Sequence, residues 1–157
     1  MESLILHDII NENLIKLSLD GSTREEVVSE LTDLLYKNGV ICSKADFIEE
    51  VKKRESLCTT AIGMGIAIPH GKCGNVIKPA VAFGRSSSGI SWDSMDGNPV
   101  HMVFLLAVPE SGAGNQHLQL LAMLSRKLMH DDFRKGLMAA KDKIQLLSML
   151  HSIFKGG

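Results

Sequence analysis

The feature that most constrains the fold is an unbroken apolar run near the middle of the chain, Met102-Val103-Phe104-Leu105-Leu106-Ala107-Val108. A strand with one face in water alternates apolar and polar side chains, so a run without alternation is typical of a strand covered on both faces. Asp96-Gly97 is typical of a turn into this strand. We therefore predict a central strand over 100–108 with a protein layer on each side.

Two further strands are predicted in the same region, over 65–69 and 79–84, and residues 13–19 are a candidate outer strand. Amphipathic helices are predicted on both sides of this region. The first opens with a capping box at Ser22-Thr23-Arg24-Glu25 and ends at Gly39, and the second runs from Ser43 to about 55. Three more helices are predicted over 116–129, 132–140 and 142–154. Strands between capped helices predict a layered α/β domain, and the absence of repeats and linkers favours a single domain over 1–157.

Composition excludes several classes of function. The formal net charge of −1 gives no basic bias, which argues against nucleic-acid binding. One Trp and one Tyr are too few for an aromatic stacking platform. Three cysteines whose spacings fit no zinc pattern, with no long apolar run, favour a cytoplasmic protein with free thiols and no membrane insertion.

His70 is the leading functional candidate. It stands in Gly63-Met64-Gly65-Ile66-Ala67-Ile68-Pro69-His70-Gly71, where Pro69 is expected to end the strand over 65–69 and leave the histidine on a rigid edge. A neutral imidazole has a free lone pair at pH 7 and can attack an electrophile without a separate base. The ordinary alternative is a turn histidine with no chemical role.

His117 is the second candidate. Asn115 is a good N-cap after Pro109, which places His117 in the first turn of the helix over 116–129. Helix N-termini favour bound anions, and loops that follow neighbouring strands meet at one edge of the sheet. We therefore expect His117 to approach His70, although a capping or solvated histidine is the simpler explanation for this residue alone.

Arg54 is the third candidate, at the end of the second helix and just before Thr59-Thr60. A guanidinium can hold two phosphoryl oxygens at once, which suits a phosphate site beside His70. A solvated arginine that complements the helix dipole is again the ordinary alternative.

Several separated motifs together resemble one family, the IIA components of the fructose and mannitol branch of the bacterial phosphoenolpyruvate-dependent sugar phosphotransferase system. The resemblance covers nearly the whole chain and is strongest from 52 to 135. Its motifs are Arg54-Glu55, Gly63 to Gly71, Phe83-Gly84-Arg85, Gly89-Ile90-Ser91-Trp92, Asp96 to His101, Ala107-Val108-Pro109 and Asn115 to Lys127.

The resemblance implies an α/β sandwich with a mixed central sheet, flanked by helices, and a phosphoryl relay. It assigns His70 as the phosphorylated histidine, His117 as the second active-site histidine and Arg54 as the phosphate-side arginine. Phospho-HPr is the implied donor and a cysteine of a IIB domain the implied acceptor, with no cofactor or metal. Sequence details look closest to the fructose-type members.

One departure from the family pattern concerns a phosphate contact. Where the family commonly has Thr-Gly-Ile-Gly, this chain has Thr60-Ala61-Ile62-Gly63. Ala61 disfavours a positive φ and would shift an amide facing the phosphate, but we interpret the change as a tolerated variation. Thr60 is a possible phosphate contact under the same resemblance.

Two other interpretations stay open. A nitrogen-type regulatory IIA protein shares the phosphorylated histidine but uses its charge to change which proteins it binds. A zinc site on His70, His101 and His117 is weaker, because His101 heads the central strand and is expected at the opposite end. The sugar and the reacting nitrogen of His70 are not determined by the sequence.

Overall fold

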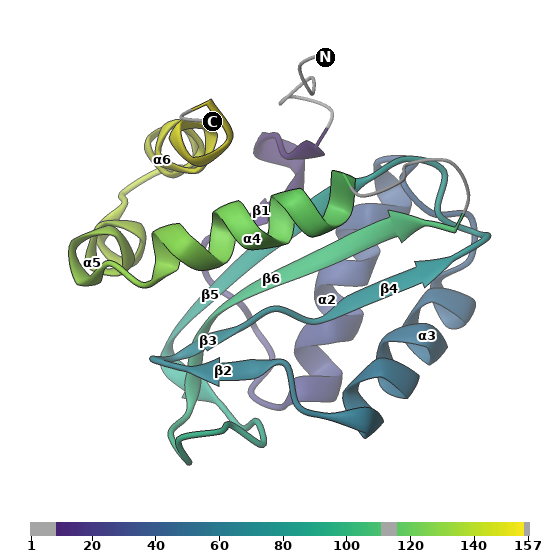
Figure 1. The fold of residues 1–157 in the computed structure, drawn as a ribbon, viewed down its shortest axis with the longest axis horizontal. Coiled ribbons are helices and arrows are strands. Elements are labelled where there is room, and N and C mark those ends of the chain that lie inside the picture. The colour runs from purple at the N-terminus through teal and green to yellow at the C-terminus, as the bar shows by residue number, and fades with distance from the viewer. Residues whose placement is uncertain (1–8, 111–115, 156–157) are drawn as a thin grey trace.

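The computed structural model describes residues 9–110 and 116–155, which form a mixed sheet between two helical layers (Figure 1). The predicted α/β sandwich is confirmed. The strands are β1 (Ile15–Lys16), β2 (Ala61–Gly63), β3 (Ile66–Ala67), β4 (His70–Cys73), β5 (Ala80–Ile90) and β6 (Val100–Pro109). The helices are the 3-10 turn η1 (Glu12–Leu14), α2 (Arg24–Lys37), α3 (Lys44–Leu57), α4 (Gln116–Leu128), α5 (Asp131–Ala139) and α6 (Lys143–Lys155).

The sheet is organised around β6, as the apolar run predicts. Its strand order is β1-β5-β6-β3-β2, and β4 also pairs with β6. β5 lies antiparallel to β6, whereas β3 and β4 lie parallel to it. Val103 and Phe104, which point to opposite faces of β6, are both buried. Both faces of the central strand are therefore covered.

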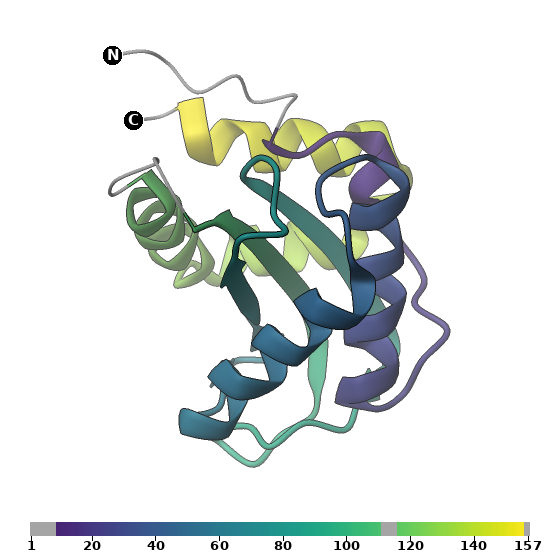
Figure 2. The ribbon, with the colours of Figure 1, turned by 90° about the vertical axis from the view of Figure 1, so that its right-hand side faces the viewer.

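The helices lie in two layers. α2 and α3 cover one face of the sheet, and α4 crosses the other face with α5 and α6 at its side (Figures 1 and 2). Phe47 and Val51 of α3 are buried against Gly71 of β4, where an added Cβ would lie 2.8 Å from Phe47 Cε1. Among the described residues no helix is long and apolar enough to cross a membrane.

The helix starts agree with the capping signals, with one shift. Ser43 Oγ accepts from the backbone N–H of Asp46 at 3.2 Å, as predicted. In α2 the N-cap is Thr23 rather than Ser22, because the Thr23 hydroxyl accepts the N–H of Glu26 at 3.2 Å. The Glu26 carboxylate accepts the N–H of Ser22, so the return bond of the predicted capping box goes to the residue before the N-cap.

The strand predicted over 65–69 does not end at Pro69. It breaks into β3 and β4, and both pair with β6 in the same register, Ile66 with Met102 and His70 with Leu106. The Pro69 carbonyl still accepts a hydrogen bond from the N–H of Leu106 in β6 at 2.9 Å. A proline removes only its own N–H from a ladder, so the interruption is local. His70 is therefore the first residue of a strand and not the residue after one.

Two other strand predictions need adjustment. β5 runs from Ala80 to Ile90, well beyond the predicted end at 84, because its later half is serine-rich and carries no apolar signal. The outer strand expected over 13–19 is limited to β1, parallel to β5.

Candidate active site

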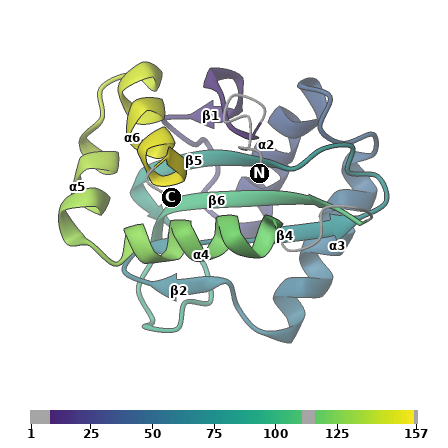
Figure 3. The ribbon, with the colours of Figure 1, turned by 45° about the horizontal axis from the view of Figure 1, so that its top comes forward.

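His70 lies on the face of the sheet that α4 covers. The adjacent Gly71 faces α3, and side chains of a strand alternate between faces. His70 and Lys72 therefore belong to the opposite face, where α4 crosses above β6 (Figures 1 and 3). The His70 side chain is half-buried, so part of the ring is open to solvent and part is packed against the protein.

The ring of His70 is oriented by one hydrogen bond. Its Nδ1 lies 3.0 Å from the carbonyl oxygen of Ile68, two residues earlier in the chain. A carbonyl can only accept, so in the neutral ring Nδ1 holds the proton and donates it. The lone pair is then on Nε2, which is the nitrogen able to attack an electrophile.

His117 occupies the first turn of α4, as the sequence predicts for its backbone. Its side chain and the expected N-cap Asn115 lie outside the described residues. Figure 3 shows the first turn of α4 directed toward the end of the sheet where β4 and β6 finish. The role assigned to His117 stays a prediction.

Arg54 lies in the last turn of α3, one turn after the residues that pack against β4. The side chain is half-buried, and Nη1 donates to the carbonyl oxygen of Cys58 at 2.7 Å. This bond holds the guanidinium at the point where α3 ends and the chain turns toward β2. An arginine held there has donors left for an anion.

Beside Arg54 lies the buried carboxylate of Glu55, to which the sequence assigns no role beyond its place in the Arg54-Glu55 motif. The Glu55 side chain is only 9% exposed. It accepts hydrogen bonds from the Thr59 and Thr60 hydroxyls, the Thr60 N–H and the Trp92 indole N–H. The signal in the sequence is its spacing, since Glu55 follows Phe47 and Val51 at intervals of four on the apolar face of α3.

Thr60 is engaged in the interior. Its hydroxyl donates to Glu55 Oε1 at 2.6 Å, and the residue is 4% exposed. Thr60 is therefore not carried into the proposed site as a phosphate contact. Ala61 is a fully buried β2 residue, and the described non-glycine residues with positive φ include only Met64. The substitution of alanine for the family's glycine therefore introduces no strain here.

His101 lies far from His70 along β6. It is the second residue of β6, whereas His70 pairs with Leu106, five residues later, or about 16 Å at 3.3 Å per residue. Its Nδ1 contacts the Ser86 carbonyl at 2.8 Å. Among the side chains that the structure describes, which do not include that of His117, no three of His, Cys, Asp or Glu are grouped to hold a metal ion.

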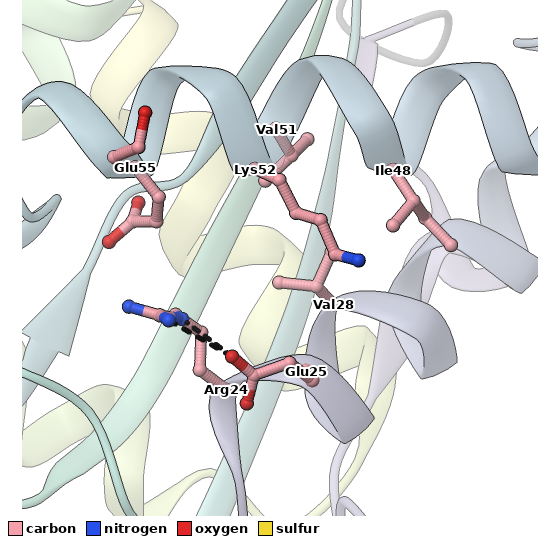
Figure 4. A pocket seen from close by; sticks show the side chains of 8 residues that line it. Arg24, Glu25, Val28, Ile48, Val51, Lys52 and Glu55 are labelled. Atoms are coloured by element: carbon pink, nitrogen blue, oxygen red, sulfur yellow. Dashed lines mark hydrogen bonds and ion pairs between the residues drawn. The ribbon is translucent and has the colours of Figure 1, made fainter.

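A pocket of about 250 Å³ lies between α2 and α3, on the side of the sheet away from His70 (Figure 4). Val28, Ile48 and Val51 line it with apolar surface. Arg24 pairs with Glu25 at 2.9 Å at one end, and the Glu55 carboxylate points toward that end. The Glu55 carboxylate, which holds the end of α3 through its hydrogen bonds, therefore also lines this pocket.

The mixed sheet with helices on both faces is the fold of solved phosphotransferase-system IIA proteins. The model of the phosphoenolpyruvate-dependent sugar phosphotransferase system, EIIA 2, matches residues 8–153. The chain therefore belongs to the type 2 EIIA family, as the resemblance predicts.

Two named relatives are fructose-specific components. The chain is 39% identical to the fructose-specific EIIABC component of Bacillus subtilis over 92% of its own length but only 22% of that protein. It is also 39% identical to the fructose-specific EIIA component of Haloferax volcanii, over 89% of this chain and 90% of the relative.

Solved structures support the same fold. The nitrogen regulatory protein IIA-Ntr from Neisseria meningitidis superposes with a TM-score of 0.86 at 31% identity, covering 94% of this chain and 99% of the other. The mannitol enzyme IIA of Escherichia coli, solved in complex with phosphorylated enzyme IIB, has a TM-score of 0.77 at 22% identity over 91% and 97% of the two chains. The second likeness concerns the fold alone.

Proposed function

We propose that this protein is a cytoplasmic phosphocarrier that accepts a phosphoryl group from phospho-HPr on Nε2 of His70 and passes it to a cysteine of a IIB domain. The observation that supports this most directly is the bond from His70 Nδ1 to the Ile68 carbonyl. It fixes the ring and leaves Nε2 as a nucleophile on the face beneath α4. Residues 1–157 would act as one EIIA domain.

The chemistry needs little from the protein beyond positioning. The Nε2 lone pair of His70 forms a bond to phosphorus while the nitrogen–phosphorus bond of the donor breaks, and its electron pair returns to the donor imidazole. In the second step the IIB thiolate attacks the same phosphorus, and His70 leaves with the electron pair. The transition state is loose, with charge on three equatorial oxygens.

Arg54 and His117 would stabilise those oxygens. Arg54 is held at the end of α3 through Cys58 and has guanidinium donors beyond that single bond. His117 would donate a hydrogen bond from the first turn of α4, where helix N–H groups also favour an anion. Both roles are positional and electrostatic.

The names of two relatives support the proposed acceptor and sugar. The Bacillus subtilis protein combines EIIA with B and C components in one chain and is named fructose-specific. The mannitol IIA structure was solved with its phosphorylated IIB partner. We therefore propose a IIB domain as the acceptor and fructose or a related sugar as the transported substrate.

A regulatory IIA protein is the second candidate. It is favoured by the close superposition on the IIA-Ntr structure, which covers nearly the whole of both chains. Such a protein would take up the phosphoryl group and use it to change its protein contacts, without efficient transfer to a sugar-specific IIB domain.

Intact-mass measurement tests the proposal. The protein is incubated with phosphoenolpyruvate, enzyme I and HPr, beside His70→Ala and His101→Ala variants, and IIB domains are then added. We expect one acid-labile phosphoryl group in the wild type and in His101→Ala, none in His70→Ala, and transfer to a fructose-type IIB. Uptake that persists in His70→Ala would overturn the assignment of His70, and uptake without transfer would favour the regulator.

A further inference from the structure

We propose that Glu55 is the positioning residue of this site and sets the orientation of the His70 ring and of the Arg54 guanidinium together. The inference rests on the proposed function, because it concerns the same phosphoryl transfer. Glu55 does not touch the reacting atoms. It acts through hydrogen bonds to the segment that joins α3 to β2.

The Glu55 carboxylate is saturated with donors. Oε2 accepts the Trp92 indole N–H at 2.9 Å, the Thr60 N–H at 3.1 Å and the Thr59 hydroxyl at 3.3 Å. Oε1 accepts the Thr60 hydroxyl at 2.6 Å. A buried carboxylate with this many donors is held in one position, and removing it leaves those donors unpaired.

A continuous series of hydrogen bonds runs from Glu55 to His70. Thr60, fastened to Glu55 by its N–H and its hydroxyl, accepts the N–H of Ile68 on its carbonyl oxygen at 3.0 Å. Ile68 in turn accepts the Nδ1–H of His70 on its own carbonyl. The tautomer and direction of the His70 ring therefore depend on where Thr60 is held.

A second connection reaches Arg54. The guanidinium donates to the Cys58 carbonyl, in the short stretch between the end of α3 and Thr59. Glu55 ties Thr59 and Thr60 back to α3 and so limits how far Cys58 can move. One carboxylate therefore fixes both the nucleophile and the cation expected to face the phosphoryl oxygens.

The two substitutions at Glu55 differ in what they preserve. In Glu55→Gln the amide oxygen can occupy the Oε2 position. The amide nitrogen can donate to the Thr60 hydroxyl, provided that this hydroxyl rotates so that its oxygen accepts. In Glu55→Ala the Trp92, Thr59 and Thr60 donors lose their acceptor. A misplacement near 1 Å at a reacting group costs roughly 100-fold in rate, whereas substrate binding is less affected.

The experiment compares Glu55→Ala and Glu55→Gln with a matched control, Glu30→Ala. Glu30 is also a carboxylate that accepts backbone N–H groups, those of Asp20 and Gly21, but it lies on α2. For each full-length variant we would measure kcat and KM for phosphoryl transfer from phospho-HPr. The ¹⁵N shifts of the His70 ring report its tautomer, and fluorescence of Trp92, the one tryptophan, reports the Glu55 contact.

We expect Glu55→Ala to lower kcat roughly 10- to 100-fold with little change in KM, to mix the His70 tautomers and to shift Trp92 emission. Glu55→Gln should recover most of kcat and one tautomer, and Glu30→Ala should change stability only. Equal losses in Glu55→Ala and Glu30→Ala, or an unchanged tautomer in a folded Glu55→Ala, would overturn the inference. If the wild type takes up no phosphoryl group, the proposed function fails, and the ring shifts still decide whether Glu55 orients His70.

Discussion

Replacing Gly71 by alanine should push α3 slightly away from the sheet and destabilise the protein. The added Cβ would lie 2.8 Å from Phe47 Cε1, 3.2 Å from Phe47 Cζ and 3.2 Å from Val51 Cγ2. Carbon atoms pack best about 3.5–4.0 Å apart, so α3 must retreat by several tenths of an ångström. Phe47 is fully buried and makes the closest contact, whereas Val51 also borders the pocket between α2 and α3 and can shift toward it.

The magnitude follows from two opposing effects. Overpacking a core typically costs about 1–3 kcal/mol, and alanine recovers about 0.4–1 kcal/mol by restricting the unfolded chain. We expect a net loss of about 1–2 kcal/mol in the free energy of unfolding, with each kcal/mol lowering Tm by about 2–4 °C in a chain of this size. Urea denaturation followed by circular dichroism measures it.

Gly136→Ala is the matched control. Its Cβ would lie 2.6 Å from Met149 Cε, but that atom is the end of a flexible side chain, and Gly136 is inside α5. Alanine there should be neutral or stabilising by up to about 1 kcal/mol. The reasoning is refuted if Gly71→Ala is as stable as wild type, or if Phe47→Leu, which removes the clashing ring atoms, does not reduce the cost in the double variant.

Two further predictions concern titratable groups. Backbone N–H groups of Asn98 and then Met64 lower the pKa of Asp96, so its contribution to stability is present above the unfolded carboxyl pKa and is lost as pH falls through the folded pKa. The stability difference between wild type and Asp96→Asn in urea should therefore shrink between pH 7 and pH 3, and a constant difference would contradict this. Burial raises the pKa of the Cys73 thiol, so iodoacetamide should label exposed Cys58 before Cys73 in peptide maps, and equal labelling would argue against it.

Patterns that are local in sequence predicted most of the architecture. The apolar run of β6 and the capping signals near the starts of α2 and α3 act over a few positions, so periodicity and capping detect these elements, with the N-cap of α2 shifted by one residue. The continuation of β3 into β4 is different, because it depends on β6, more than thirty residues away. A proline inside an apolar segment predicts an end unless that distant partner strand is known.

The site was predicted as separate residues and not as a network. His70 and Arg54 are recognisable by residue type and by motif. Glu55 is a charged residue at a buried helix position, and its donors come from Thr60, which is close in sequence, and from Trp92, which is not. The residue type alone does not distinguish such a carboxylate from a solvated one, since the partners appear only after folding.

The short length of β4 has a consequence for how this surface behaves in a crowded cell. Among the described residues β4 pairs only with β6, so the backbone groups on its other side form an open sheet edge next to His70. Open edges invite other strands to add, which leads to aggregation. Here the edge is four residues long, begins after a proline without an N–H and includes the exposed Lys72. His70 can therefore lie beside an unpaired sheet edge, because this edge is too short to promote β-aggregation.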